Sequence, residues 1–247
     1  MHSRFIKTPA ILFNVDGTLW DFKGAMRSAL GESLKALNKH DPLAGGKLNV
    51  EKMTEAREDI YQQMRGHIAD LNTLREESIS RVLQDAGRPN PTLASLLARV
   101  YFSHKEKIRA LFTDVLFTLK QLAPYYRLGL LSNGNSHAAA LGITDLIEFE
   151  VFSQNHGGIE NPDPRIFEIT AMKTGCPIGQ LLHVGDLFEI DLLGTLDSGA
   201  QSAWLNRNSG EQGPSPVNQI STLAELPGLL GVPQSAFSQH RKKGPRG

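Results

Sequence analysis

The chain has 247 residues, and its 26 basic residues balance 26 acidic ones, with an isoelectric point near 7.1. This length suits one large domain or a core domain with an insertion, and the neutral charge argues against a broad surface for nucleic acid or anionic membrane. The single cysteine, Cys176, excludes an intrachain disulfide and favours a reducing compartment. We therefore expect a cytoplasmic protein without nucleic-acid or membrane partners, and the composition leaves its oligomeric state open.

The first predicted element is a short buried strand over residues 11–15, which stops at the turn Asp16-Gly17-Thr18. From residue 22 to residue 107 the apolar residues recur at helical spacing and no strand pattern is present. Glycine and proline pairs interrupt this region, so we expect about four helices there.

Strands and helices alternate after residue 107. The pattern predicts helices over residues 112–122, 137–141 and 165–174 and from about 191, and strands over residues 128–131, 150–153, 181–184 and, last, 202–206. Such alternation is typical of an α/β protein whose parallel sheet carries helices on both faces. The polar, basic tail over residues 236–247 is expected to be disordered.

Polar clusters follow three of the predicted strands, and parallel strands bring their carboxyl ends to one edge of the sheet. The hydroxyl and backbone N–H groups of one cluster suit phosphate oxygens, and the carboxylates of the other two suit a hard cation such as Mg²⁺. Each cluster alone is an ordinary turn or helix cap, but the three together predict a binding site. The clusters are Ser132-Asn133-Gly134, Asn14-Val15-Asp16-Gly17-Thr18, and Gly185-Asp186 with Asp191.

In this order, the motifs resemble those of the haloacid dehalogenase superfamily, mainly its phosphohydrolases with a helical cap. The first family motif reads Asp-x-Asp-Gly-Thr-Leu, and residues 14–19 here read Asn-Val-Asp-Gly-Thr-Leu. Ser132 matches the second motif, residues 161–167 resemble the third, and residues 185–191 resemble the acidic fourth. The resemblance covers residues 10–230 and implies a Rossmann-like core of residues 1–20 and 108–235, with residues 21–107 as an inserted all-helical cap.

The resemblance also implies a role for each site residue. Catalysis would involve the nucleophile position Asn14, the general acid/base Asp16, Ser132, and the lysine position Asn161. The phosphate of a small phosphorylated molecule would be bound by Thr18, Ser132, Asn133 and Gly134. The cofactor would be Mg²⁺, held by Asn14, Asp16, Asp186 and Asp191.

The sequence departs from the family pattern at two charged positions. Asn14 replaces the attacking aspartate, and a neutral amide with delocalised lone pairs is a poor nucleophile and a weaker metal ligand. Asn161 replaces the lysine that steadies the charge of the nucleophile and the phosphate. One anion and one cation are lost together, so the net charge of the site is unchanged.

Three interpretations of these two departures remain open. The first is a phosphatase scaffold for small phosphorylated metabolites that is weak or inactive, with Mg²⁺ binding weakened by Asn14. The second is a non-catalytic ligand-binding or regulatory protein, and the third is an engineered inactive phosphatase. Whether the chain is an enzyme is therefore not decided by its sequence.

Overall fold

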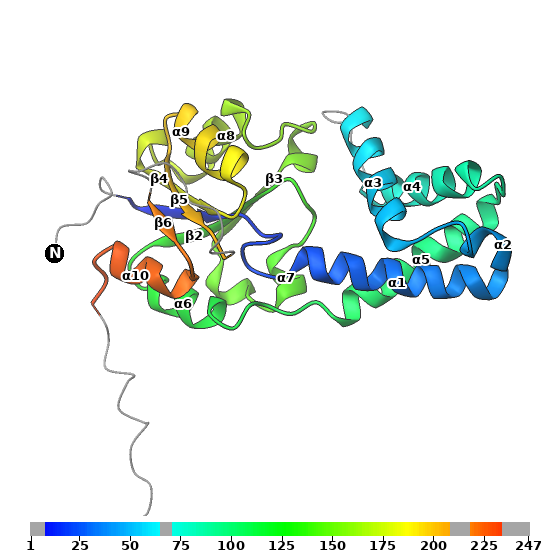
Figure 1. Ribbon diagram of the computed structural model, residues 1–247. Helices are drawn as coiled ribbons and strands as arrows, with labels where there is room; N and C mark the ends of the chain where they lie inside the picture. The colour runs from blue at the N-terminus through cyan, green and yellow to red at the C-terminus, as the bar shows by residue number, and fades with distance from the viewer. Residues whose placement is uncertain (1–7, 65–70, 208–217, 234–247) are drawn as a thin grey trace, which may run out of the picture.

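The computed structural model describes residues 8–64, 71–207 and 218–233 (Figure 1). In Figure 1 a sheet flanked by helices lies beside a group of helices formed by the blue to green-cyan part of the chain. We call this group, residues 22–107, the helical block. The tail that the sequence predicts to be disordered, residues 236–247, lies outside the described residues.

A six-stranded parallel sheet organises the rest of the fold, and this confirms the predicted α/β class. The strand order is β3-β2-β1-β4-β5-β6, so the first strand in sequence lies in the middle of the sheet. The carboxyl ends of β1, β2 and β4 are consequently neighbours at one edge. The strands are β1 (Ala10–Phe13), β2 (Arg127–Ser132), β3 (Phe149–Phe152), β4 (Leu181–Gly185), β5 (Gln201–Leu205) and β6 (Gln219–Ile220).

The prediction that the strand at residues 202–206 is the last one was wrong. The two-residue strand β6 continues the sheet, with Trp204 N–H bonded to Asn218 O and Asn206 N–H bonded to Ile220 O, both at 2.8 Å. Two residues are too few to show the alternation by which a strand is found in a sequence. Strand β6 forms because β5 offers it an edge, which is a tertiary effect.

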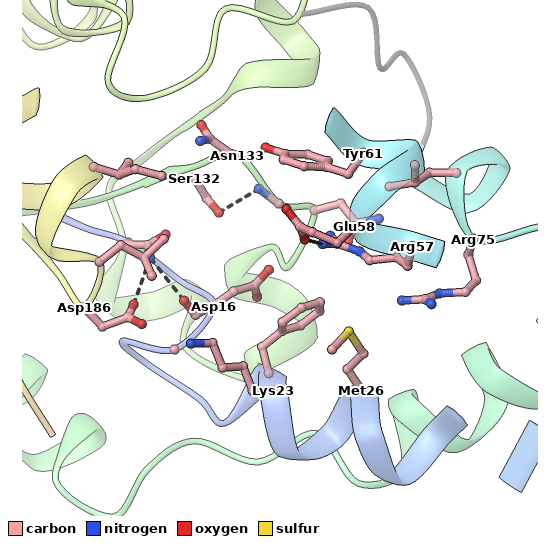
Figure 2. Close-up of a pocket in the computed structure, with 18 of the residues that line it drawn as sticks. Asp16, Lys23, Met26, Arg57, Glu58, Tyr61, Arg75, Ser132, Asn133 and Asp186 are labelled. Carbon is pink, nitrogen blue, oxygen red and sulfur yellow. Dashed lines mark hydrogen bonds and ion pairs between the residues drawn. The ribbon is translucent and has the colours of Figure 1, made fainter. Parts of the chain in front are cut away.

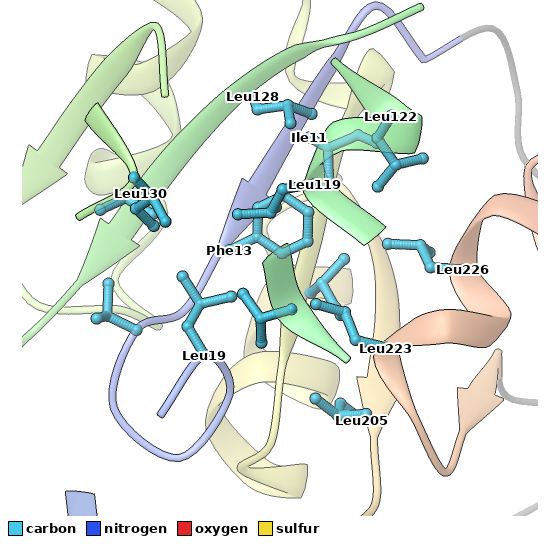
Figure 3. Close-up of a cluster of buried hydrophobic side chains, with 14 of the residues drawn as sticks. Ile11, Phe13, Leu19, Leu119, Leu122, Leu128, Leu130, Leu205, Leu223 and Leu226 are labelled. Atoms are coloured by element: carbon cyan, nitrogen blue, oxygen red, sulfur yellow. The ribbon is translucent and has the colours of Figure 1, made fainter. Parts of the chain in front are cut away.

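Alternate side chains of the central strand supply the cores on the two faces of the sheet. Ile11 and Phe13 belong to the cluster in Figure 3, where α6 (Val115–Leu122) and α10 (Leu226–Leu229) cover them. Leu12 belongs to the other cluster, which includes Ile166 and Phe167 of α8 (Pro164–Thr174). Both faces of β1 are buried, and the strand is wholly apolar. Packing against the two clusters holds it in place from both faces.

Short helical segments connect the strands. A π-helix, Phe188–Gly194, stands where the sequence predicts a helix from about residue 191. It begins close to the end of β4 and therefore carries Asp191 back toward the edge of the sheet. The other segments are α7 (Ala138–Leu141), α9 (Thr195–Asp197), and the 3₁₀ turns Thr144–Leu146, Ser153–His156, Ile178–Gln180 and Leu223–Glu225.

The helical block has an apolar core of its own, separate from the two faces of the sheet. Its first helix begins where the Asp21 side chain accepts a hydrogen bond from Gly24 N–H, and its last begins at Pro91, where Asn90 accepts from Leu93 N–H. No helix in the described segments is long and apolar enough to cross a membrane. The helices of the block are α1 (Phe22–His40), α2 (Pro42–Gly45), α3 (Val50–Met64), α4 (Leu71–Asp85) and α5 (Pro91–Lys107).

Candidate active site

A pocket of about 600 Å³ lies between the carboxyl edge of the sheet and the helical block. Figure 2 shows Asp16, Ser132 and Asp186 on the sheet side, and Arg57, Tyr61 and Arg75 on the side of the block. The structure thus brings together the three clusters that the sequence places at strand ends. Of the predicted site residues, only Thr18 does not line the pocket.

Asn14 follows β1 and directs its amide nitrogen at the acidic side chains of the site. Asn14 Nδ2 donates to Asp186 Oδ1 (3.1 Å) and to the backbone oxygen of Asp16 (3.1 Å), with a longer contact to Asp191 Oδ2 (3.5 Å). Its own oxygen, Oδ1, accepts from Val15 N–H at 2.8 Å. Both ends of the amide are therefore used in holding the loop and the carboxylates together.

Asp191 is almost fully buried and is surrounded by neutral or weakly basic donors. Its Oδ1 accepts from Asn161 Nδ2 (2.9 Å) and contacts His183 Nε2 (3.0 Å), and its Oδ2 accepts from Leu187 N–H (2.9 Å). A buried carboxylate requires such partners because desolvation penalises its charge. Asn161 therefore binds the acidic group directly, at the position where the resemblance expects a lysine.

Asp186 is held by two neutral donors and has a raised pKa. It accepts from Asn14 and, at 2.9 Å, from the hydroxyl of Thr18, which is fully buried. Burial, followed by the nearby charge of Asp191, raises the pKa of Asp186 to about 6. Gly17 makes the close approach of this loop to Asp186 possible: its φ is +88°, and a Cβ there would lie 2.3 Å from Asp186 Oδ2.

Asp16 is held by a tryptophan of its own loop. Trp20 Nε1 donates to Asp16 Oδ1 at 2.7 Å, and burial raises the pKa of the Asp16 carboxyl despite this bond. The turn after β2 approaches the other side of the carboxyl, where a Cβ on Gly134 would lie 2.5 Å from Asp16 Oδ2. The glycine thus lets the second cluster contact the first.

The donors that the sequence assigns to phosphate are largely used within the protein. Asn133 exchanges two hydrogen bonds of 2.8 Å with the backbone of Asn161, and Gly134 N–H donates to Ser132 Oγ at 3.0 Å. Thr18 donates to Asp186 as described above. In this structure Asn133 orders the loop that carries Asn161, and Thr18 orders Asp186.

The geometry does not fit the cation that the resemblance implies. The oxygens expected to bind it on Asp16, Asp186 and Asp191 are those that contact Asn14 Nδ2, so an N–H donor lies where they converge. The metal-binding atom of an amide is its oxygen, and that atom of Asn14 faces Val15 N–H. Among the described residues no group of three or more His, Cys, Asp or Glu side chains is arranged to hold a metal ion.

Two buried cations of the helical block also line the pocket, and no sequence pattern indicates them. Arg75 is 4% exposed and Lys105 is 5% exposed. Basic residues in amphipathic helices ordinarily face solvent, so spacing alone does not distinguish these two from their exposed neighbours. The position of Trp20 after the first motif suits a substrate entrance and hinge packing equally well, and its bond to Asp16 becomes visible only in the fold.

Comparison with known proteins places this site in a family. The chain matches the haloacid dehalogenase-like hydrolase family over residues 8–199. It is 27% identical over 229 residues to 5-amino-6-(5-phospho-D-ribitylamino)uracil phosphatase YigB of Escherichia coli, covering 90% of this chain and 95% of the relative. It is 28% identical over 232 residues to human N-acylneuraminate-9-phosphatase, covering 90% and 93%.

Among solved structures, the fold is similar to that of a 2-haloacid dehalogenase from Pseudomonas syringae pv. tomato. The TM-score is 0.73 at 26% sequence identity, and the match covers 91% of this chain and 98% of the other. The curated relatives given above are named as phosphatases of small phosphorylated molecules. The family match extends over most of the chain and includes all four motifs, so the chain belongs to the haloacid dehalogenase-like hydrolases.

Proposed function

We propose that this chain binds a small phosphorylated molecule in the pocket and hydrolyses it weakly or not at all. The substrates in the names of the related phosphatases support the ligand class. The observation that carries the loss of turnover is the position of Asn14, whose amide nitrogen donates to the carboxylates of the site. In this proposal residues 21–107 act as the cap over the pocket, and the protein works in the cytoplasm.

Asn14 is unsuited to attack phosphorus both chemically and geometrically. An attacking group needs an available lone pair, whereas the amide nitrogen of Asn14 has its lone pair delocalised and its hydrogens directed at Asp186 and Asp191. The oxygen of the amide accepts from Val15 N–H. A covalent phosphoryl intermediate at this position is therefore disfavoured.

Asn161 extends the same argument to the lysine position. Its side chain gives Asp191 a hydrogen bond of 2.9 Å but no positive charge, so the charge on a bound phosphate is not neutralised there. With asparagine at positions 14 and 161, the carboxylates of the site accept hydrogen bonds from neutral side chains and not from a cation. This pairing favours inherited loss of catalysis over a single change made to trap a substrate.

Phosphatases of this family generally use Mg²⁺. In this chain we propose that Mg²⁺ binds weakly at most, because the Asn14 N–H group lies where the oxygens of Asp16, Asp186 and Asp191 converge. Binding would require the amide to rotate and to give up its bonds to these oxygens and to Val15.

A second candidate function is slow hydrolysis in which Asp16 activates water without a covalent intermediate. The raised pKa of Asp16 makes its carboxylate a better base, which favours this route. Against it, the route gives up the division of the reaction into two easier steps. We place it below simple binding.

The test is turnover of p-nitrophenyl phosphate with added Mg²⁺ by four chains: the unaltered one, Asn14→Asp, Asn161→Lys, and the double variant. We expect turnover to rise by at least about 100-fold in the double variant, since it regains both the nucleophile and the cation. Exposed Asn155→Asp is the matched control for an added carboxylate and should change nothing.

Each other outcome contradicts part of the proposal. Rapid turnover by the unaltered chain would show that Asn14 does not prevent catalysis. Full turnover by Asn14→Asp alone would show that Asn161 is not part of an inherited loss, and a trapped or engineered phosphatase would be the better explanation.

A further inference from the structure

Most of the charges that line the pocket are grouped by sign. The cations all come from the helical block, and three of the four carboxylates come from the strand ends. Figure 2 shows Asp186 and Arg75 at opposite ends of the view, whereas Lys23 of α1 lies near Asp16 and Asp186. Of the cations, Arg27 is paired with Glu51 and Arg57 with Glu58. The cations are Lys23, Arg27, Arg57, Arg75 and Lys105; the carboxylates are Asp16, Glu58, Asp186 and Asp191.

Arg75, on α4, is a buried guanidinium without an acidic partner among the described residues. Its Nη2 donates to the Tyr101 hydroxyl at 3.2 Å, and its central carbon lies 4.2 Å from the centre of the Tyr101 ring. Its Nη1 is buried and has no hydrogen-bond partner in the described part of the chain. Burial, the main cause, lowers the pKa of Arg75, as does the charge of Arg57. A buried donor left without an acceptor is costly, which points to an acceptor that the protein itself does not supply.

Lys105 lies one helical turn after Tyr101 on α5 and faces the same pocket. Its ammonium nitrogen is 5.6–5.8 Å from the ring centres of Phe22, Tyr101 and Phe102. It makes no hydrogen bond or ion pair with a residue in the described ranges; burial lowers its pKa, and the charge of Asp16 partly opposes this. Aromatic faces and a carboxylate beyond ion-pair distance stabilise a cation only partly, so an anion in direct contact would stabilise it further.

The strand-end side of the pocket is lined by carboxylates and disfavours an anion. Its carboxylates already accept hydrogen bonds from Asn14, Asn161 and Trp20, and Asn161 brings no positive charge to the site. An anionic group placed there would meet Asp16, Asp186 and Asp191 at short range, and like charges at short range repel strongly in a partly buried site.

We propose that Arg75 and Lys105 form an anion-binding subsite that receives the phosphate group of the ligand on the helical-block side of the pocket. The end of the ligand that faces Asp186 is then uncharged and rich in hydroxyl groups. This inference rests on the proposed function, since it specifies how the pocket holds its small ligand. The guanidinium of Arg75 supplies directed donors, and the ammonium of Lys105 supplies a compact charge.

The experiment uses four probes with the same six-carbon chain. They are 6-phosphogluconate with both anionic groups, sorbitol 6-phosphate with the phosphate alone, gluconate with the carboxylate alone, and neutral sorbitol. Affinity for each is measured by titration calorimetry with the full chain and with Arg75→Gln, Lys105→Gln and Ser132→Ala. Arg81→Gln on α4 and Lys107→Gln on α5 are matched controls, because both side chains are exposed.

We expect sorbitol 6-phosphate to bind more tightly than sorbitol. Its affinity should fall at least tenfold in both Arg75→Gln and Lys105→Gln, and by less than twofold in Ser132→Ala and in the controls. Binding of gluconate, and not of sorbitol 6-phosphate, that depends on the two cations would contradict both the inference and the phosphorylated ligand on which it rests.

Two results would overturn the inference while the proposed function stands. One is binding of the charged probes that depends on Ser132 and not on Arg75 or Lys105, which would place the anion at the strand ends. The other is equal affinity for charged probes and sorbitol. If no charged probe binds at all, the proposed function fails and this inference fails with it. Arg75→Met and Lys105→Met, which keep an unbranched side chain, repeat the test if a glutamine variant does not fold.

Discussion

The two sides of the pocket satisfy their charged groups in different ways. At the strand ends, Asp186 accepts from Thr18 and Asn14, and Asp191 accepts from Asn161, so the carboxylates are held by neutral donors of the protein. In the helical block, Arg75 has a buried nitrogen with no acceptor among the described residues. Carboxylates that already accept hydrogen bonds from the protein gain little from a bound cation. A buried donor without an acceptor favours the binding of an anionic ligand.

The largest expected effect, and the strongest test of this comparison, is on the affinity of the strand-end side for Mg²⁺. Asn14→Asp replaces the N–H donor with a third carboxylate facing Asp186 and Asp191, and Mg²⁺ favours such oxygen ligands. We expect Mg²⁺ affinity, measured by calorimetry, to rise by about 100-fold or more, since one ligand is gained and the donor is removed. Equal Mg²⁺ affinity in the two chains would contradict the position that we give to the amide.

The next effect concerns the stability of the helical block. Arg75→Met and Lys105→Met each remove a buried charge that makes no ion pair among the described residues, at the loss of contacts with Tyr101. We expect the free energy of unfolding in ligand-free buffer to rise by about 1–3 kcal/mol for each variant, because the desolvation cost of the charge disappears. Denaturant unfolding measures it. A loss of stability in both variants would mean that the cations are structural.

A smaller, pH-dependent effect is expected at the strand ends. The pKa of Asp186 is about 6 in the folded chain, against an ordinary value of 3.8, so its contribution to stability is present below about pH 4 and is lost as the pH rises through 6. Asp186→Asn removes this loss and should raise the free energy of unfolding at pH 7 by on the order of 1–2 kcal/mol, with little effect at pH 4. Chemical unfolding at both pH values checks it; the same change at pH 4 and pH 7 would show that Asp186 is not the group responsible.

The smallest effects should come from the exposed basic residues of the same helices. Arg81 makes only an exposed ion pair with Asp85, at 3.2 Å, and Lys107 is exposed. Exposed pairs contribute little, so Arg81→Gln and Lys107→Gln should change the unfolding free energy by less than about 0.5 kcal/mol. A larger change in either would remove the contrast between buried and exposed cations on which the anion subsite depends.

The sequence predicts most of the sheet and the strand-end side of the pocket, because both depend on local patterns. Apolar runs such as residues 181–184 end at glycine and acidic residues, and parallel strands must bring those ends together. Asn14 and Asn161 could be recognised as unusual because the motifs around them fix their positions. His183 lies within the predicted strand over residues 181–184, and it is buried and contacts Asp191 there.

The other side of the pocket depends on tertiary contacts that leave no local pattern. Arg75 and Arg81 lie on the same helix, and the packing of α4 against α3 and α5 leaves one buried and the other exposed. The Asn14 amide likewise has two partners more than 170 positions away in the chain, in addition to its local bonds to Val15 and Asp16. Such long-range pairings decide which charges have partners, and the spacing of residues does not.

The most direct test of the account is intact-mass spectrometry of the chain after incubation with p-nitrophenyl phosphate and Mg²⁺, followed by peptide mapping of residue 14. The Asn14→Asp, Asn161→Lys double variant serves as the positive control for trapping a phosphoryl group. The account predicts an unaltered mass for the chain and an intact amide at residue 14. A phosphoryl adduct at residue 14, or its conversion to aspartate in the purified protein, would contradict it.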